Sequence, residues 1–249
     1  MISISGVKKS FGSQVVLDGI DCEIASGEMI AVVGPSGTGK SVLLKIITGL
    51  MPADSGEVVI GKDSMTGASS EDERMAICRR MGVLFQSAAL FDSLSLLENV
   101  AFPLHAYGGC GRDEIYERAW KSIDDVELRA HAHHLPGEVS IGMRKRAGIA
   151  RALITNPEII LFDEPNTGLD PYMGQEIYDL INLTHKTYGF TGIVISHEIP
   201  EVFQVCHRVV MLYKGRVQYD GEVDNYLDSD NEAVKQFVAG DIHGPISMG

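Results

Sequence analysis

The segment with the clearest chemical meaning is GPSGTGKS, residues 34–41. It fits the pattern G-x-x-x-x-G-K-[ST] and lies between an apolar run, MIAVV, and a stretch with helical spacing. Glycines let backbone N–H groups turn inward around a phosphate, and the start of the following helix adds partial positive charge. Lys40 is expected to reach the β- and γ-phosphates of a nucleotide, and Ser41 to offer its hydroxyl to Mg²⁺. The predicted phosphate-binding residues are Gly34, Pro35, Ser36, Gly37, Thr38, Gly39, Lys40 and Ser41.

A pair of neighbouring acids forms the second candidate. In IILFDEP, four apolar residues predict a buried strand, and Asp163 follows at its carboxyl end, where ligands bind in open α/β sheets. An acid at this position can hold Mg²⁺. A second carboxylate directly beside it is costly unless a cation and a water use it, so Glu164 is predicted to be the general base for an attacking water. The alternative is a solvated acidic turn.

The stretch HLPGEVSIGMRKRAGIARAL, residues 134–153, predicts a helix whose first turn could meet a phosphate. Ser140 and the N–H groups after it would lie at the helix N-terminus, which favours anions. Ile141 stands where a flexible glycine would be expected.

Composition and charge limit the classes of protein that fit. The chain has 249 residues, is 45% hydrophobic and carries a formal charge of −13. Such an acidic chain is a poor non-specific binder of nucleic acid or anionic lipid, so we expect no nucleic-acid partner and a membrane contact only through another protein. No apolar run reaches the roughly 18 residues that a membrane span needs.

The four cysteines form no C-x-x-C pair and are expected to be reduced thiols. The histidines of HAHHL lack other ligands at metal-site spacing.

The elements that must position these motifs alternate between strands and helices. Short strands are predicted before residue 34, followed by a helix from Lys40 to about Leu50. Residues 93–155 lose strand character and read as three helices, and alternation returns from 158 with a helix at 172–186 and another at 198–206. RVVMLYKGRVQYDG predicts a hairpin. An α/β body with a helical insertion is the simplest fold.

With GPSGTGKS, VSIGM and IILFDEP in this order, the chain resembles the nucleotide-binding subunits of ABC transporters over almost its whole length. The resemblance implies an α/β P-loop core of the ABC ATPase type, with an N-terminal antiparallel β subdomain and an inserted α-helical subdomain. It divides the chain into a core (1–87 and 156–228), a helical subdomain (88–155) and a C-terminal extension (229–249). It implies ATP and Mg²⁺ as ligands.

The same resemblance assigns roles to residues that mean little alone. Phe11 matches the aromatic that stacks on adenine, and Gln86 the glutamine that touches Mg²⁺ and responds to the transmembrane partner. Asp170 matches the acid of the D-loop. His197 matches the histidine that orients the γ-phosphate and water. Glu164, His197 and Gln86 are thus the implied catalytic residues, and Ser41, Gln86 and Asp163 the implied metal ligands.

VSIGM replaces the family's usual signature, LSGGQ, and implies that Ser140, Ile141, Gly142 and Met143 contact the ATP of the opposite subunit in a homodimer. A narrower resemblance rests on Met143 with RKRAGIARAL, on ALFDSLSLLENVAFPL and on the tail VKQFVAGDIHGPI. These segments resemble the ATPases of Mla/Mce-type lipid transporters, which implies a transmembrane permease, an Mce-type lipid-binding partner and a peripheral place on the cytoplasmic face of the inner membrane.

Three alternatives remain. The chain could be an ABC ATPase for another substrate, such as amino acids or lipoproteins. It could be an ABC protein of DNA repair or translation, although no sustained heptads or second nucleotide domain are present. A P-loop kinase would need neither the signature helix nor His197.

Overall fold

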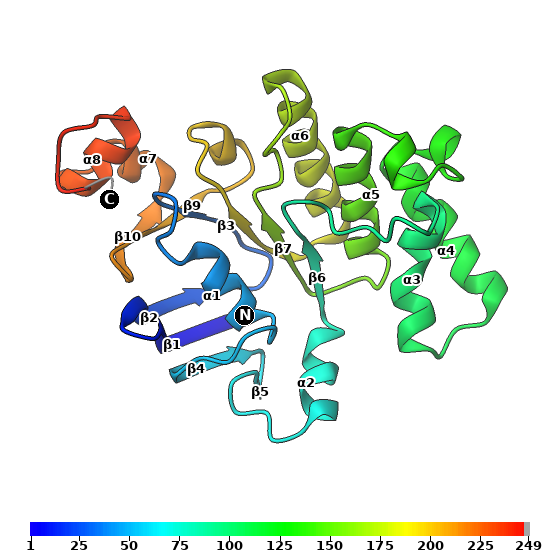
Figure 1. Ribbon diagram of the computed structural model, residues 1–249, viewed down its shortest axis with the longest axis horizontal. Coiled ribbons are helices and arrows are strands. Elements are labelled where there is room, and N and C mark those ends of the chain that lie inside the picture. Colours follow the sequence, from blue (N-terminus) through cyan, green and yellow to red (C-terminus); the bar gives the residue numbers. More distant parts are fainter. Residues whose placement is uncertain (247–249) are drawn as a thin grey trace. The chain divides into compact units, whose positions relative to one another are not determined.

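The computed structural model describes residues 1–246, which divide into two units (Figure 1). The first unit contains Met1–Cys78 and the chain from Thr191 onward, and the second contains Arg79–Phe190. The sequence-based boundaries at 88, 155 and 229 describe a finer division that these units do not test. No helix within residues 1–246 is long and apolar enough to cross a membrane.

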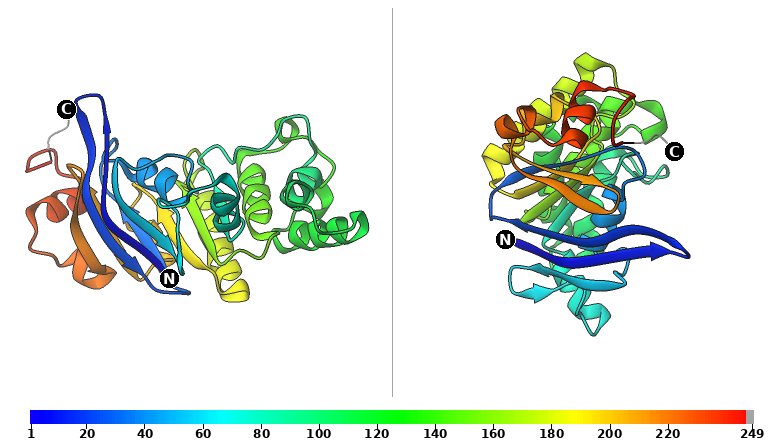
Figure 2. Two further views of the ribbon diagram at one scale, coloured as in Figure 1. Left: turned by 90° about the horizontal axis from the view of Figure 1, so that it is seen from below. Right: turned by 90° about the vertical axis from the view of Figure 1, so that its left-hand side faces the viewer.

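The first unit is built on two groups of strands. An antiparallel sheet has the order β2-β1-β4-β5, and β1 and β2 run side by side in both views of Figure 2. The other strands follow the order β10-β9-β3-β8, with β3 parallel to both of its neighbours. The strands are β1 (Ile2–Phe11), β2 (Gln14–Ile24), β3 (Met29–Val33), β4 (Ser55–Ile60), β5 (Asp63–Ser64), β8 (Thr191–Ile195), β9 (Arg208–Tyr213) and β10 (Arg216–Glu222). The helices are α1 (Lys40–Ile47), α2 (Glu71–Cys78), α7 (Val223–Leu227) and α8 (Glu232–Ala239).

The second unit combines two parallel strands with four helices. Strands β6 (Met81–Leu84) and β7 (Ile159–Asp163) pair from Met81 with Ile159 to Leu84 with Phe162. The helices are α3 (Leu96–Tyr107), α4 (Arg112–Asp125), α5 (Ile141–Leu153) and α6 (Pro171–Tyr188). Two 3₁₀ turns, η1 (Arg129–His131) and η2 (Pro136–Glu138), lie between α4 and α5.

Glycines let α5 approach β6 closely. A Cβ atom at Gly82 would lie 2.4 Å from the carbonyl oxygen of Ala152, and one at Gly148 would lie 2.6 Å from a methyl carbon of Leu84. Neither distance leaves room for a side-chain carbon, so Gly82 lets β6 approach the backbone of α5 and Gly148 lets the Leu84 side chain pack against the α5 backbone. This contact fixes α5 against the strand that leads into Gln86.

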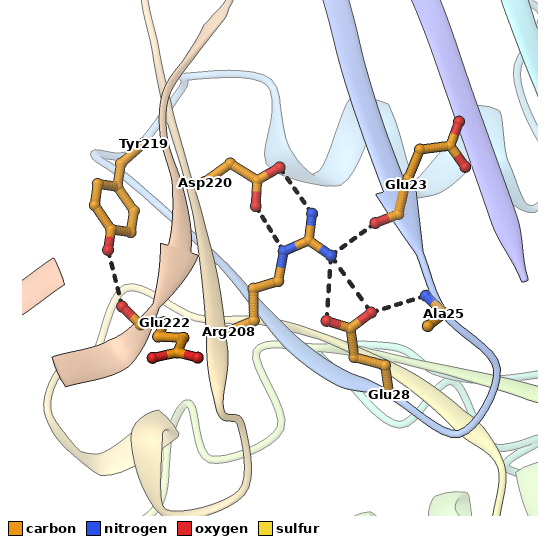
Figure 3. A network of polar contacts seen from close by, with 7 residues as sticks. All are labelled: Glu23, Ala25, Glu28, Arg208, Tyr219, Asp220 and Glu222. Carbon is orange, nitrogen blue, oxygen red and sulfur yellow. Dashed lines mark hydrogen bonds and ion pairs between the residues drawn. The ribbon is translucent and has the colours of Figure 1, made fainter. Parts of the chain in front are cut away.

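An ion-pair network in the first unit joins β9 to β2, β10 and the turn before β3 (Figure 3). The Arg208 guanidinium donates two hydrogen bonds to Asp220, at 2.6 and 2.9 Å, and one of 2.7 Å to the carbonyl of Glu23. It also lies 3.2 and 3.4 Å from the two carboxylate oxygens of Glu28. The bonds to Asp220, more than those to Glu28, raise the pKa of Arg208.

The three helices expected in residues 93–155 are present as α3, α4 and α5, and the expected hairpin is β9–β10. The expected helix over 198–206 is wrong, because this segment holds only a 3₁₀ turn, η3 (Glu201–Gln204). Pro200 disfavours helical angles at the residue before it, which opposes a helix running through Ile199. The turn is closed by hydrogen bonds between residues three apart, from Phe203 N to the Pro200 carbonyl and from Val205 N to the Val202 carbonyl.

The predicted C-terminal extension, described to residue 246, folds onto its own unit. Helix α8 buries Val234 fully, and Phe237 and Val238 are half-buried. The Gln236 side chain accepts a bond of 2.7 Å from the N–H of Ile246 and donates one of 3.0 Å to its carbonyl. The tail is therefore held by its own hydrogen bonds as well as by apolar burial.

Candidate functional site

The loop between β3 and α1 has a backbone that only glycine accommodates at two points. Gly34 has φ +142°, and a Cβ atom there would lie 2.2 Å from the carbonyl oxygen of Leu212. Gly39, just before α1, has φ +96°, and its Cβ would lie 2.7 Å from a methyl carbon of Leu17. All five residues of β3 are buried, so the loop begins at a strand that is held in the core.

Lys40 begins α1 and places its ammonium inside this loop. Its side chain is nearly buried, at 6% exposure, and Nζ donates to the carbonyls of Gly34 and Pro35 at 2.7 and 2.9 Å. The first N–H groups of a helix have no partner within the helix and favour an anion. A glycine-shaped loop, a buried ammonium and a helix N-terminus together fit a phosphate group. Ser41, predicted to hold Mg²⁺, is half-buried at the second position of α1.

Two more predicted residues lie in the first unit. Phe11 is the last residue of β1 and is 47% exposed, with the ammonium of Lys9 5.7 Å from its ring centre. This leaves a ring face available for stacking. His197 is exposed and follows the buried end of β8, where Ser196 accepts a bond of 3.0 Å from the N–H of Glu198.

In the second unit, the carboxyl ends of β6 and β7 bring Gln86 and Glu164 together. Because the strands are parallel and in register, the residues that follow them emerge at one edge. Gln86 Nε2 donates to Glu164 Oε2 at 2.7 Å, and Thr167 Oγ1 donates to the same oxygen at 3.1 Å. Asp163 ends β7 and is half-buried. Glu164 has φ +48°, a left-handed conformation that non-glycine residues rarely adopt.

Lys145 of α5 contacts the backbone of Glu164. The side chain is 1% exposed, and Nζ donates to the Glu164 carbonyl oxygen at 3.0 Å. Burial lowers the pKa of Lys145 to about 8, and the carboxylates of Glu164 and Asp163 oppose this shift. The sequence-based account missed this residue. The signal was present, since Lys145 lies three residues after Gly142 and four before Ile149, on the face of α5 that is buried.

Arg151, six residues further along α5, holds the loop that contains Gln86. Its guanidinium donates to the carbonyls of Ala88 and Ala89 at 2.6 and 2.7 Å. Both alanines have positive φ, at 61° and 45°. The loop after β6 is therefore kept in an unusual conformation by a side chain of α5.

The predicted signature residues lie at the start of α5. Ser140 caps the helix, its hydroxyl accepting a bond of 3.2 Å from Met143 N. Ile141 is 43% exposed, so its side chain is not part of the core. Gly142 is buried, and a Cβ there would lie 2.8 Å from the terminal methyl of Met173 on α6. Asp170 caps α6 in the same way, accepting from Met173 N at 3.0 Å.

A groove of about 440 Å³ lies in the second unit beside these residues. Its lining includes Gln86, Ile141, Lys145 and Thr167. The structure thus gathers Gln86, Glu164 and Lys145 in the second unit. Lys40 and Ser41, which are predicted to bind phosphate and Mg²⁺, lie together at the start of α1 in the first unit.

Comparison with known proteins decides the family. The family model described as "ABC transporter" matches residues 17–167. The chain belongs to the ABC transporter family. It is therefore an ATP-binding, ATP-hydrolysing protein, as its phosphate-binding loop predicts, and the expected ABC ATPase fold is confirmed by solved relatives.

The ABC protein is similar to relatives over nearly its whole length. It is 33% identical to the intermembrane phospholipid transport system ATP-binding protein MlaF of Haemophilus influenzae, covering 99% of this chain and 93% of MlaF. It is 38% identical to the protein TRIGALACTOSYLDIACYLGLYCEROL 3 of Arabidopsis thaliana, covering 99% of this chain and 75% of that protein. Among solved structures, the ATP-binding cassette MJ0796, dimeric and bound to ADP and Pi, has a TM-score of 0.81 and 33% identity, covering 90% of this chain and 99% of MJ0796.

Proposed function

We propose that this ABC ATPase powers a transporter of phospholipids or other hydrophobic molecules. The observation that carries the proposal is similarity to MlaF from two organisms, Haemophilus influenzae and Escherichia coli, over at least 91% of each MlaF chain. A second candidate is transport of an amino acid, because the methionine import protein MetN of Caulobacter vibrioides is 36% identical over 241 residues. MetN, however, is covered over only 72% of its length, so MlaF is the fuller match.

The proposal assigns phosphate binding to the first unit. Lys40 would exchange its bonds to the loop carbonyls of Gly34 and Pro35 for phosphate oxygens, which are stronger, charged acceptors. Phe11 would stack on adenine through its exposed ring. His197 would orient the γ-phosphate and the attacking water.

The proposal assigns hydrolysis to Glu164, which would accept a proton from the attacking water. Its carboxylate oxygen already accepts bonds from Gln86 and Thr167, so the side chain is aimed by two donors. Ser41, Gln86 and Asp163 would hold Mg²⁺, whose oxygen-seeking chemistry suits a hydroxyl, an amide and a carboxylate. When bound, Mg²⁺ neutralises charge on the β- and γ-phosphates.

The proposed working form is a homodimer in which Ser140, Ile141, Gly142 and Met143 of one subunit contact the ATP of the other. Support comes from the capped helix start at Ser140 and from the dimeric state of MJ0796 with ADP and Pi. Asp170 would contribute from the loop before α6.

The proposed permease contact is the segment after Gln86. Phe91 and Phe102 are 45% and 40% exposed, and their ring centres lie 4.5 Å apart. Buried Asn99 holds the intervening loop by accepting from Phe91 N at 2.7 Å and donating to the carbonyl of Leu94 at 3.0 Å. An exposed aromatic pair held in a fixed position is suited to binding the surface of another protein. The proposal places the ATPase on the cytoplasmic face of the membrane through the permease, with an Mce-type lipid-binding protein in the complex.

The test is transfer of substrate by the complete complex. The chain is purified with its permease, reconstituted into vesicles, and assayed for ATP-dependent transfer of a fluorescent phospholipid to acceptor vesicles. We expect transfer with the natural chain and none with Glu164→Gln. ATP-dependent uptake of methionine without lipid transfer would contradict the proposal and favour the second candidate.

A further inference from the structure

Helix α5 contacts residues 164–167, named the catalytic turn for its proposed base Glu164, through the buried side chain of Lys145. Lys145 is 1% exposed, yet it lies on a helix whose other basic residues, such as Arg144 and Arg146, reach carbonyls or acids nearer the surface. A buried lysine is costly unless it is paired and hydrogen-bonded. Within residues 1–246, its Nζ donates a hydrogen bond to the Glu164 carbonyl oxygen, at 3.0 Å.

The Glu164 backbone needs such support. Its φ of +48° is a conformation that a side chain disfavours, so neighbouring groups must hold it. The carbonyl oxygen accepts from Lys145 Nζ on one side and from Thr167 N, at 3.3 Å, on the other. The same residue's carboxylate accepts from Gln86 and Thr167. A rotation of this backbone would move the carboxylate away from its donors.

We propose that Lys145 is a positioning residue for hydrolysis, acting through its hydrogen bond to the Glu164 carbonyl. It lies four residues after Ile141, so it connects the helix that begins with the signature to the catalytic turn of the same chain. The inference rests on the proposed role of Glu164 as general base. Lys145 itself touches neither nucleotide nor water in this account.

The first test is Lys145→Met in the full-length chain. Methionine keeps most of the side-chain length and removes the donor, and urea unfolding checks that the variant is folded, because loss of one buried charge can destabilise a chain. We expect the turnover number kcat to fall about 10- to 100-fold, the effect of displacing a catalytic group by roughly 1 Å. The dissociation constant of a fluorescent ATP analogue should change less than about twofold, because Lys40 and Ser41 are untouched.

Two further variants identify the cause. Lys186→Met removes an exposed ammonium from α6 of the same unit and should leave kcat unchanged. Lys145→Gln retains an N–H donor without the charge and should recover part of the lost kcat. A Gln variant as slow as the Met variant, or a Met variant with normal kcat, would overturn the proposal.

Epistasis separates this inference from the proposed function. With radiolabelled ATP and enzyme in excess, single-turnover rates are compared for Glu164→Gln with and without Lys145→Met. If Lys145 acts through Glu164, adding the second substitution should slow the reaction less than twofold. If Lys145→Met slows the Glu164→Gln chain by the same factor as it slows the unsubstituted chain, Lys145 does not act through Glu164. That result would overturn the role of Lys145 while leaving Glu164 as the base. Near-normal turnover of Glu164→Gln alone would instead refute the proposed base.

Discussion

The Arg208 network offers a sharp prediction about stability. Replacing Arg208 with Met removes the guanidinium that binds Asp220, Glu28 and the carbonyl of Glu23. It leaves two carboxylates close together without their cation. The side chains are only partly shielded, with exposures of 25% for Arg208, 24% for Glu28 and 29% for Asp220.

The magnitude follows from that partial burial. Breaking a fully buried ion pair costs about 3–5 kcal/mol, and an exposed pair contributes roughly 0–1 kcal/mol. With about three quarters of each side chain covered, Arg208→Met should lower the free energy of unfolding by about 2–3 kcal/mol. Arg216→Met is the matched control: it lies at the start of β10 and pairs with Asp18, but its side chain is 67% exposed. It should cost less than about 1 kcal/mol.

Urea unfolding, followed by circular dichroism, measures both variants. At a typical slope of about 2–3 kcal/mol per molar urea, Arg208→Met should lower the midpoint by roughly 1 M, and Arg216→Met by less than about 0.4 M. Adding Asp220→Asn to Arg208→Met should restore part of the loss, because one uncompensated carboxylate disappears. Equal midpoints for the two arginine variants would refute the reasoning from burial.

Two other predictions concern the signature and the tail. Ile141→Gly should raise ATPase turnover by about 5- to 30-fold at most, if the isoleucine weakens closure of the dimer by ~1–2 kcal/mol. ATP affinity of the isolated subunit should not change; unchanged or lower turnover would mean that Ile141, which is 43% exposed, points away from the partner's phosphate. Truncation after Asp228 removes α8 and the buried side chains of Val234 and Ile246. It should weaken assembly with the second subunit or permease, measured by co-purification, and unchanged assembly and activity would show that the tail serves neither.

The phosphate-binding loop could be predicted from sequence because its chemistry is local. GPSGTGKS requires glycine angles and a lysine at fixed spacing, and the structure contains both at Gly34, Gly39 and Lys40. The strand before it could also be predicted, since a run of five apolar residues that ends at a glycine is typical of a buried strand, and β3 is one.

Contacts between distant segments could not be predicted in this way. The bond from Gln86 to Glu164 joins residues 78 positions apart, and it depends on the parallel register of β6 and β7. Lys145 was overlooked because it lies in RKRA, a run that reads as a solvated basic face. The packing of α5 shows that Lys145 turns inward, as its spacing from Gly142 and Ile149 indicates, while Arg144 and Arg146 are less deeply buried. The error at 198–206 arose because the effect of Pro200, which disfavours helical angles at Ile199, was not taken into account.

The most direct test of the central claim is the state of the Glu164→Gln chain with ATP and Mg²⁺. If Glu164 is the general base and ATP joins two copies, this variant should bind ATP, hydrolyse it about 10²–10⁴-fold more slowly, and accumulate as a dimer. Light scattering after size exclusion should then give twice the subunit mass of 27.0 kDa, with intact ATP in the peak. Lys40→Ala, which lacks the ammonium proposed to bind phosphate, should remain at the mass of one subunit. Near-normal turnover in Glu164→Gln, or a single-subunit mass with ATP bound, would contradict the account.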